Sequence, residues 1–105
     1  METATAATRC WYLYLIECTD NSIYTGIAVD VAARYDAHVR GKGARYTRAH
    51  PPRRLLAVLR CPDRSSAARE EYRVKQLNAA AKRALVTVLN ATGAAAIGDA
   101  AQDGA

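Results

Sequence analysis

Two runs of aromatic and branched residues, joined by a short polar segment, constrain the fold of this chain more than any other feature. Residues 10–18 read CWYLYLIEC and residues 23–29 read IYTGIAV, with TDNS between them. Tyr, Trp, Ile and Val favour strands, whereas Thr, Asp, Asn and Ser favour turns. Two strand-forming runs joined by so short a turn predict a β-hairpin.

A helix is predicted directly after the hairpin. Asp30 is a suitable N-cap, and apolar and basic residues recur at helical spacing over residues 31–40 until Gly41 ends the pattern. Residues 41–54, GKGARYTRAHPPRR, follow this helix. Their glycines and paired prolines predict a loop.

One more strand and two more helices complete the predicted core. LLAVLRC, residues 55–61, predicts the third strand. A helix through residues 67–77, capped by Asp63 or Ser65, and a further helix over residues 78–90 come after it. The order ββαβαα predicts an α+β fold, with a small three-stranded antiparallel sheet flanked by helices, because the helices do not alternate with the strands.

The two ends of the chain carry little apolar bulk. Residues 1–8 read METATAAT, and residues 91–105 are rich in Ala and Gly. Such segments bury too little surface to offset the entropy lost on ordering. We therefore expect flexible tails at residues 1–8 and 91–105 around one domain at residues 9–90.

The charge balance points to a polyanionic partner. Fifteen Lys and Arg against ten Asp and Glu give a net charge of +5 and an isoelectric point near 9.4. No run approaches the roughly 20 apolar residues that span a bilayer, so no membrane partner is expected. The three cysteines, Cys10, Cys18 and Cys61, lack CxxC spacing. Neither a disulfide framework nor a zinc site is indicated, and reduced thiols favour a cytoplasmic location.

A pair of tyrosines in the hairpin carries a family resemblance. Tyr14 lies in LYL and Tyr24 in YTG, ten residues later, and the helix segment EYRVKQL follows in the expected order. Residues 10–89 resemble a GIY-YIG nuclease domain, most closely the short stand-alone bacterial members. The first motif lacks its glycine, and Thr25 stands where the second motif has Ile.

The resemblance implies the roles of five residues. Tyr14 and Tyr24 are the motif tyrosines, Arg34 is the active-site arginine of the first helix, and Glu71 is the metal ligand. His38 matches a position that is His in several members. The implied cofactor is Mg²⁺ or Mn²⁺, held by Glu71.

These residue types suit phosphodiester hydrolysis, which needs positive charge and a deprotonated water. Mg²⁺ requires only one or two carboxylates, so Glu71 alone is a sufficient anchor. Glu70 lies about 100° away around the helix, so only one of the two can face the site. A surface pair with Lys75 is the alternative role of Glu71. Which tyrosine activates the water is left open.

Basic residues in and beyond the predicted loop are expected to contact a nucleic-acid backbone, with one aromatic ring able to stack on a base. This expected nucleic-acid-binding set is Lys42, Arg45, Tyr46, Arg48, Arg53 and Lys75, with Arg54 as a further basic residue of the same stretch.

The sequence thus predicts a monomeric or weakly dimeric, metal-dependent endonuclease that hydrolyses DNA. Branched or damaged DNA is the expected substrate, in repair or recombination, and RNA is not excluded. Two alternatives remain open at this point: a non-cleaving nucleic-acid-binding module of the same fold, and a basic protein-interaction adaptor.

Overall fold

The predicted hairpin forms the first two strands of an antiparallel sheet, β1 (Trp11–Cys18) and β2 (Ile23–Ala28). The structure is a computed structural model that describes residues 9–92. Asn21 occupies the left-handed region of backbone space at φ 71°, which Asn tolerates better than most residues, and so closes the turn. Since the structure describes residues 9–92, the predicted tails lie outside the described residues, apart from residues 91 and 92 of the C-terminal tail.

The third strand, β3 (Pro52–Cys61), pairs with β1 and places β1 at the centre of the sheet. The strand order is β2-β1-β3, and all pairings are antiparallel. β3 begins before the predicted residue 55, because its first residues extend the ladder to Cys18 through two register shifts, at which Leu56 and Arg53 of β3 are skipped. β2 is thus an edge strand, with only one neighbour in the sheet.

Three helices begin where the sequence predicts an N-cap. In α2 (Val31–Val39) the Asp30 carboxylate accepts from the Ala33 amide at 3.0 Å. Asp63, rather than Ser65, caps α4 (Arg64–Lys75) by accepting from the Ser66 amide at 2.7 Å. α5 (Ala79–Thr92) begins after Asn78, whose side chain accepts from the Ala81 amide at 2.8 Å.

A short helix, α3 (Arg45–Ala49), lies inside the segment predicted to be a loop. No side chain caps its first turn, but Thr47 in its middle is buried and its hydroxyl donates to the Ala44 carbonyl at 3.0 Å. This buried contact stabilises the turn, and a contact of that kind leaves no periodic pattern in a five-residue stretch. The observed order is therefore ββααβαα, and the predicted α+β fold is confirmed.

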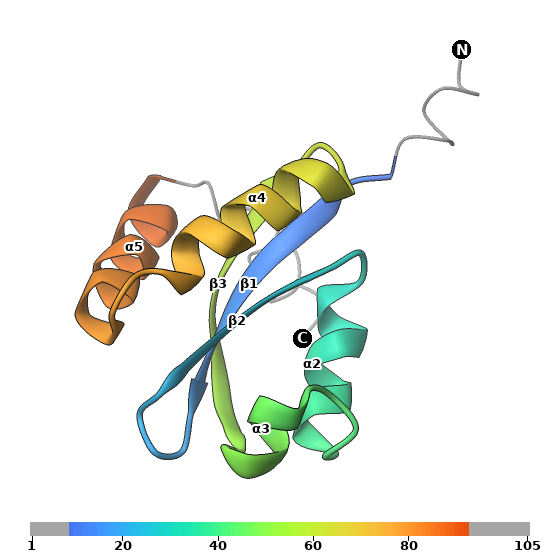
Figure 1. Ribbon diagram of the computed structural model, residues 1–105, viewed down its shortest axis with the longest axis vertical. Coiled ribbons are helices and arrows are strands. Elements are labelled where there is room, and N and C mark those ends of the chain that lie inside the picture. Colours follow the sequence, from blue (N-terminus) through green and yellow to red (C-terminus); the bar gives the residue numbers. More distant parts are fainter. Residues whose placement is uncertain (1–8, 93–105) are drawn as a thin grey trace.

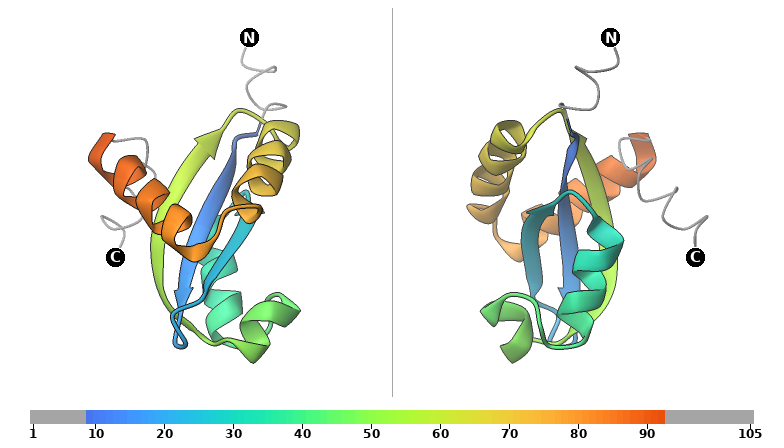
Figure 2. Two further views of the ribbon diagram at one scale, coloured as in Figure 1. Left: turned by 60° about the vertical axis from the view of Figure 1, so that its left-hand side comes forward. Right: turned by 90° about the vertical axis from the view of Figure 1, so that its right-hand side faces the viewer.

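Helices cover both faces of the sheet (Figures 1 and 2). On one face Leu13 and Leu15 pack with Val74 of α4 and Leu89 of α5. On the other face a second apolar cluster contains Tyr14 and Val31, the first residue of α2. Alternate residues of β1 thus point to opposite sides, as strand geometry requires. No helix within residues 9–92 is long and apolar enough to cross a bilayer.

Thr25 of β2 carries a polar atom into the apolar interior. Its side chain is 2% exposed, and its hydroxyl has no hydrogen-bond partner among the described residues. A buried hydroxyl without a partner loses its hydration and gains nothing in return. We expect Thr25→Val, which keeps the branched shape, to raise the free energy of unfolding by about 1 kcal/mol in urea denaturation.

Thr47→Val is the matched control, because the equally buried Thr47 hydroxyl bonds to His38 and to the Ala44 carbonyl. That variant should be less stable than the wild type. A Thr25→Val protein destabilised to the same extent would mean that the Thr25 hydroxyl has a partner in solution.

Candidate active site

The Tyr14 side chain crosses the edge strand of the sheet. Tyr14 pairs with Gly26 in the β1–β2 ladder, and a Cβ atom at Gly26 would lie 2.5 Å from the Tyr14 hydroxyl oxygen. Only a residue without a side chain leaves that path open. Gly26 therefore allows a tyrosine on the central strand to bring its hydroxyl toward the outer edge of β2.

His38 of α2 receives that hydroxyl inside the protein. The Tyr14 oxygen lies 2.9 Å from His38 Nε2, and the His38 side chain is buried. On the other side of the ring, Nδ1 lies 2.6 Å from the Thr47 hydroxyl of α3. Gly43 packs against the ring as well, because a Cβ there would overlap His38 Nδ1.

One tautomer of His38 suits this chain of contacts. When Thr47 donates its single hydroxyl proton to the Ala44 carbonyl, it accepts from His38 Nδ1–H. The Ala44 amide also approaches Nδ1, but at 3.4 Å, which is a much weaker contact. Nε2 then carries a lone pair and accepts the Tyr14 hydroxyl proton. The imidazole is thus positioned to take a proton from Tyr14.

Tyr24 lies beside this pair on the same face of the sheet. Its ring centroid is 6.2 Å from that of Tyr14 and 5.1 Å from that of His38. Tyr46 of α3 stacks on Tyr24, and His50 stacks on Tyr46 at 4.1 Å. Tyr46 thus supports Tyr24 within a ring stack and is still 37% exposed, so its contact with a nucleic-acid base stays a prediction.

Arg34 and Glu71 act on the Tyr14 hydroxyl from two different helices. Burial raises the pKa of Tyr14 to about 12, and the neighbouring Tyr24 adds to the rise. A hydrogen bond from Arg34 and its positive charge lower that pKa, whereas the negative charge of Glu71 raises it. Two tyrosines, a histidine, an arginine and a glutamate from β1, β2, α2 and α4 therefore converge at the β2 edge.

The two neighbouring glutamates of α4 have different surroundings. Glu70 accepts from the Arg73 guanidinium at 2.7 Å on the outer side of the helix. Glu71 is less exposed, and one of its oxygens lies 3.1 Å from the Lys75 ammonium. The i,i+4 pair of Glu71 with Lys75 is thus observed, and the metal-ligand role of Glu71 stays a prediction. Within residues 9–92 no group of three or more His, Cys, Asp and Glu side chains gathers around one point.

The residues expected to bind nucleic acid fall into two groups. Lys42, Arg45 and Arg48 are exposed, and their side chains form no ion pair or hydrogen bond within the described part of the chain. Arg53 lies elsewhere, bonded to the β1–β2 turn and to Glu17. Lys75 pairs with Glu71 beside the site. Lys42, Arg45 and Arg48 are named the α3 basic surface from here on.

Three residues of the site escaped the sequence reasoning: Gly26, Gly43 and Thr47. Gly26 stands in the second tyrosine motif, and its place opposite Tyr14 follows once the hairpin register is known. Gly43 sits in a loop with a second glycine, which gives no hint of contact with a histidine ring. Thr47 left no signal, because a threonine in a basic stretch is ordinarily exposed.

Comparisons with known proteins identify the family of this chain. Residues 10–84 match the GIY-YIG catalytic domain family. A UPF0213 protein of Cupriavidus necator is 49% identical over 87 residues, covering 83% of this chain and 95% of the relative. The UPF0213 protein YhbQ of Salmonella typhimurium is 51% identical over 77 residues, covering 73% of this chain and 77% of the relative.

One solved structure is also similar. It is the solution NMR structure of a UPF0213 protein from Bacillus halodurans, with a TM-score of 0.49 and 44% identity. The match covers 75% of this chain and 84% of that one.

The buried state of His38 predicts a pH dependence of stability. Burial lowers the pKa of His38 from its ordinary 6.5, and the charge of Arg34 lowers it further. The unfolded chain therefore binds this proton first, so stability should be complete above 6.5 and fall as the pH drops toward the lower folded pKa. Urea denaturation between roughly pH 8 and pH 5 measures this slope.

His38→Gln should be less stable at every pH but lack this part of the slope. NMR titration of the imidazole gives an independent check. A His38 resonance that titrates above 6.5 would contradict the neutral, buried ring.

Proposed function

Since the chain belongs to the family of GIY-YIG catalytic domains, we propose that it is a metal-dependent endonuclease that hydrolyses phosphodiester bonds in DNA. The matched region, residues 10–84, contains every residue of the candidate site. The observation that carries the proposal is the convergence of the Tyr14–His38 pair with Tyr24, Arg34 and Glu71 at the β2 edge.

Tyr14 and His38 together can accept a proton from the attacking water. A tyrosine with a pKa of about 12 keeps its proton at neutral pH and is a poor base by itself. The neutral His38 ring offers its Nε2 lone pair 2.9 Å away. As the Tyr14 oxygen takes the water proton, its own proton passes to Nε2. The Thr47 hydroxyl holds Nδ1–H and so keeps the ring in the receptive tautomer.

Arg34 and Tyr24 complete the protein's contribution. The guanidinium is always protonated and offers a fixed fork of donors that matches phosphate oxygens. Positive charge at that position also lowers the pKa of Tyr14, which assists its proton transfer. In this proposal the Tyr24 hydroxyl donates to the phosphate, and the stack on Tyr46 supports the Tyr24 ring.

The donor set fits a divalent cation of the magnesium type. One Glu71 oxygen pairs with Lys75, and the other has no partner among residues 9–92. Mg²⁺ and Mn²⁺ accept a single carboxylate when phosphate oxygens and water fill the remaining positions. The chemistry that such a cation supplies is positive charge against the phosphate and a lower pKa for water. Glu71 would hold it, with Lys75 limiting the local negative charge.

The α3 basic surface extends the site toward the backbone of the substrate. Lys42, Arg45 and Arg48 lie on the same segment as Tyr46, which stacks on Tyr24. We assign branched or damaged DNA in repair or recombination as the substrate class, because a domain of this size offers little surface for reading base sequence.

Glu71→Gln should abolish metal-dependent cleavage, because an amide of the same shape lacks the charge that holds a divalent ion. Cleavage of plasmid and branched oligonucleotides with Mg²⁺, Mn²⁺ or EDTA measures this, and DNA affinity should stay within about two-fold of the wild type.

Glu70→Gln is the matched control. Because the Glu70 carboxylate pairs with Arg73, this substitution should leave the cleavage rate nearly unchanged. Arg34→Ala and Tyr24→Phe should reduce turnover far more than binding. Cleavage by Glu71→Gln at the wild-type rate would refute the metal-ligand assignment. A wild-type protein that binds DNA but cleaves no form of it with any divalent ion would leave a non-cleaving binding module.

Simultaneous replacement of Lys42, Arg45 and Arg48 by Ala should weaken binding to unrelated DNA sequences equally. Each lost phosphate contact reduces the slope of log K against log salt by roughly one unit, so the total reduction should approach three. Fluorescence anisotropy across a salt series in EDTA measures the slope. An unchanged slope would exclude the α3 basic surface from DNA contact.

A further inference from the structure

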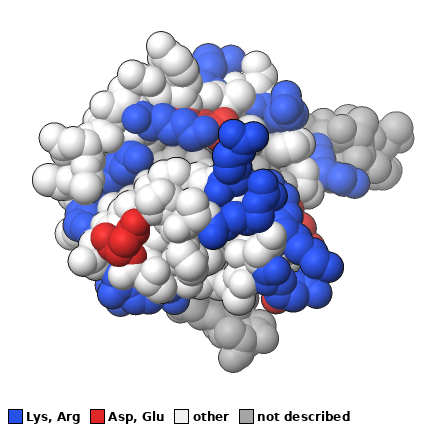
Figure 3. Space-filling view, turned by 60° about the horizontal axis from the view of Figure 1, so that its bottom comes forward, with Lys and Arg blue, Asp and Glu red and all other residues white. Residues whose placement is uncertain are grey.

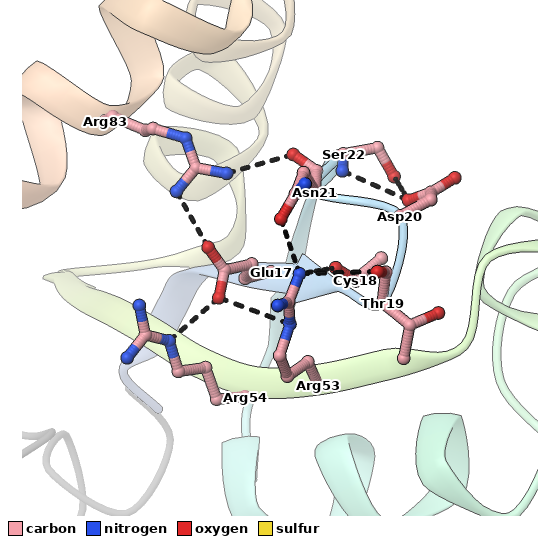
Figure 4. A network of polar contacts seen from close by, with 9 residues as sticks. All are labelled: Glu17, Cys18, Thr19, Asp20, Asn21, Ser22, Arg53, Arg54 and Arg83. Atoms are coloured by element: carbon pink, nitrogen blue, oxygen red, sulfur yellow. Dashed lines mark hydrogen bonds and ion pairs between the residues drawn. The ribbon is translucent and has the colours of Figure 1, made fainter.

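A single buried carboxylate gathers three arginines at the far end of β1 (Figure 4). Glu17 has a side chain only 7% exposed. Its two oxygens contact Arg54 Nε at 2.9 Å and Arg83 at 2.8 Å, and Arg53 Nε lies 3.5 Å away. These hydrogen bonds and charges, led by that of Arg83, hold the pKa of Glu17 below its ordinary value. We name these four residues the Glu17 cluster.

The cluster carries more positive charge than its own carboxylate can neutralise. Three guanidiniums against one carboxylate leave an excess of two positive charges. One arginine would suffice to compensate Glu17, and each further guanidinium brings repulsion between like charges. A local excess of this kind is relieved when an anion binds.

The three arginines differ in how many of their guanidinium donors have no partner within residues 9–92. One terminal nitrogen of Arg53 donates to the Cys18 carbonyl and to the Asn21 side chain. Arg83 uses both terminal nitrogens, on Glu17 and on the Asn21 carbonyl. Arg54 contacts Glu17 through Nε alone, and its two terminal nitrogens have no partner within the described residues. Its side chain is 65% exposed, so a pair of oriented donors faces solvent.

Cationic side chains connect this cluster with the candidate active site. Lys75 pairs with Glu71, and its charge is close enough to Lys82 to lower the pKa of Lys82, after the larger effect of burial. Lys82 donates to the carbonyl of Ile23, the residue before Tyr24, at 3.4 Å. Arg83 follows Lys82 directly and reaches Glu17. The path therefore runs from Glu71 across the start of α5 to the Glu17 cluster.

This path lies apart from the α3 basic surface. Arg83 and Lys75 belong to the helices that cover one face of the sheet, whereas α3 accompanies α2 on the other (Figure 2). Figure 3 shows the end of the molecule that carries α3 and the β1–β2 turn, where Lys and Arg side chains form several patches separated by other residues. The Glu17 cluster and the α3 basic surface thus lie on opposite faces of the sheet, with Arg53 and Arg54 on β3 (Figure 2).

We propose that Arg54, beside the positive charge of Arg83, binds a backbone phosphate of the nucleic-acid substrate at a distance from the scissile phosphate, on the other face of the sheet from the α3 basic surface. Glu17 is a positioning residue that orients the two guanidiniums. Guanidinium forks match phosphate oxygens, and a fork already fixed by a carboxylate loses little freedom on binding. The inference rests on the proposed function only in taking nucleic acid as the substrate.

Arg54→Gln tests the proposal in EDTA, where binding is separated from cleavage. Anisotropy of fluorescein-labelled duplex and branched DNA should give a salt slope lower by about one unit, and an affinity roughly ten-fold weaker at about 0.1 M salt. Arg54→Lys keeps the charge and should retain the slope. Combined with the triple Ala variant of the α3 basic surface, Arg54→Gln should act additively, because the two regions contact different phosphates.

Arg73→Gln is the matched control, since Arg73 is 60% exposed and also pairs with a glutamate, Glu70. Thermal unfolding of each variant separates a fold effect from a binding effect, because a purely structural Arg54 would alter Tm and leave the slope unchanged. Equal slopes for Arg54→Gln and Arg73→Gln would overturn the inference and leave the proposed nuclease intact. A wild-type protein that binds no form of DNA would overturn both.

Discussion

The contact between the Tyr14 hydroxyl and His38 joins parts of the chain that are otherwise separate. Tyr14 lies on the central strand, His38 on α2, and Thr47, which holds the far side of the imidazole, on α3. All three side chains are almost completely buried. Because buried polar groups are costly unless they are paired, the positions of α2 and α3 relative to the sheet are fixed by this chain of hydrogen bonds as well as by apolar packing. The candidate site inherits its geometry from the same contacts.

The sequence predicted those parts of the fold whose signals are local. Strand propensity and N-capping act over a few residues. They therefore predicted the two hairpin strands, the caps at Asp30 and Asn78, and the helix that contains Glu71. Helix α3 was missed because its stability comes from Thr47 packing against a histidine nine residues earlier. A stretch of five residues cannot show a helical period.

The sequence predicted which residues belong to the candidate site. It predicted much less well which side chains these residues contact. Tyr14, Tyr24, Arg34, His38 and Glu71 could be named from motif positions, and the structure brings them together at one edge. Arg53 and Tyr46 were chosen because a basic stretch with one aromatic ring can follow a nucleic-acid backbone and stack on a base. Their partners, Glu17 for one and Tyr24 for the other, lie far away in the sequence. Charge and aromaticity in a loop do not reveal such partners.

Helix α3 has two kinds of side chain on one short turn of backbone. Thr47 points inward and holds the imidazole, whereas Arg45 and Arg48 face solvent. Position 47 tolerates almost no change, because the Thr47 side chain is buried and its hydroxyl contacts both His38 and the Ala44 carbonyl. The outward positions are under no such restraint from the interior. Under the proposed function, variation at the outward positions among descendants of such a chain can alter how strongly nucleic acid is held while the His38 ring stays untouched. Affinity and chemistry can then evolve independently on the same five residues.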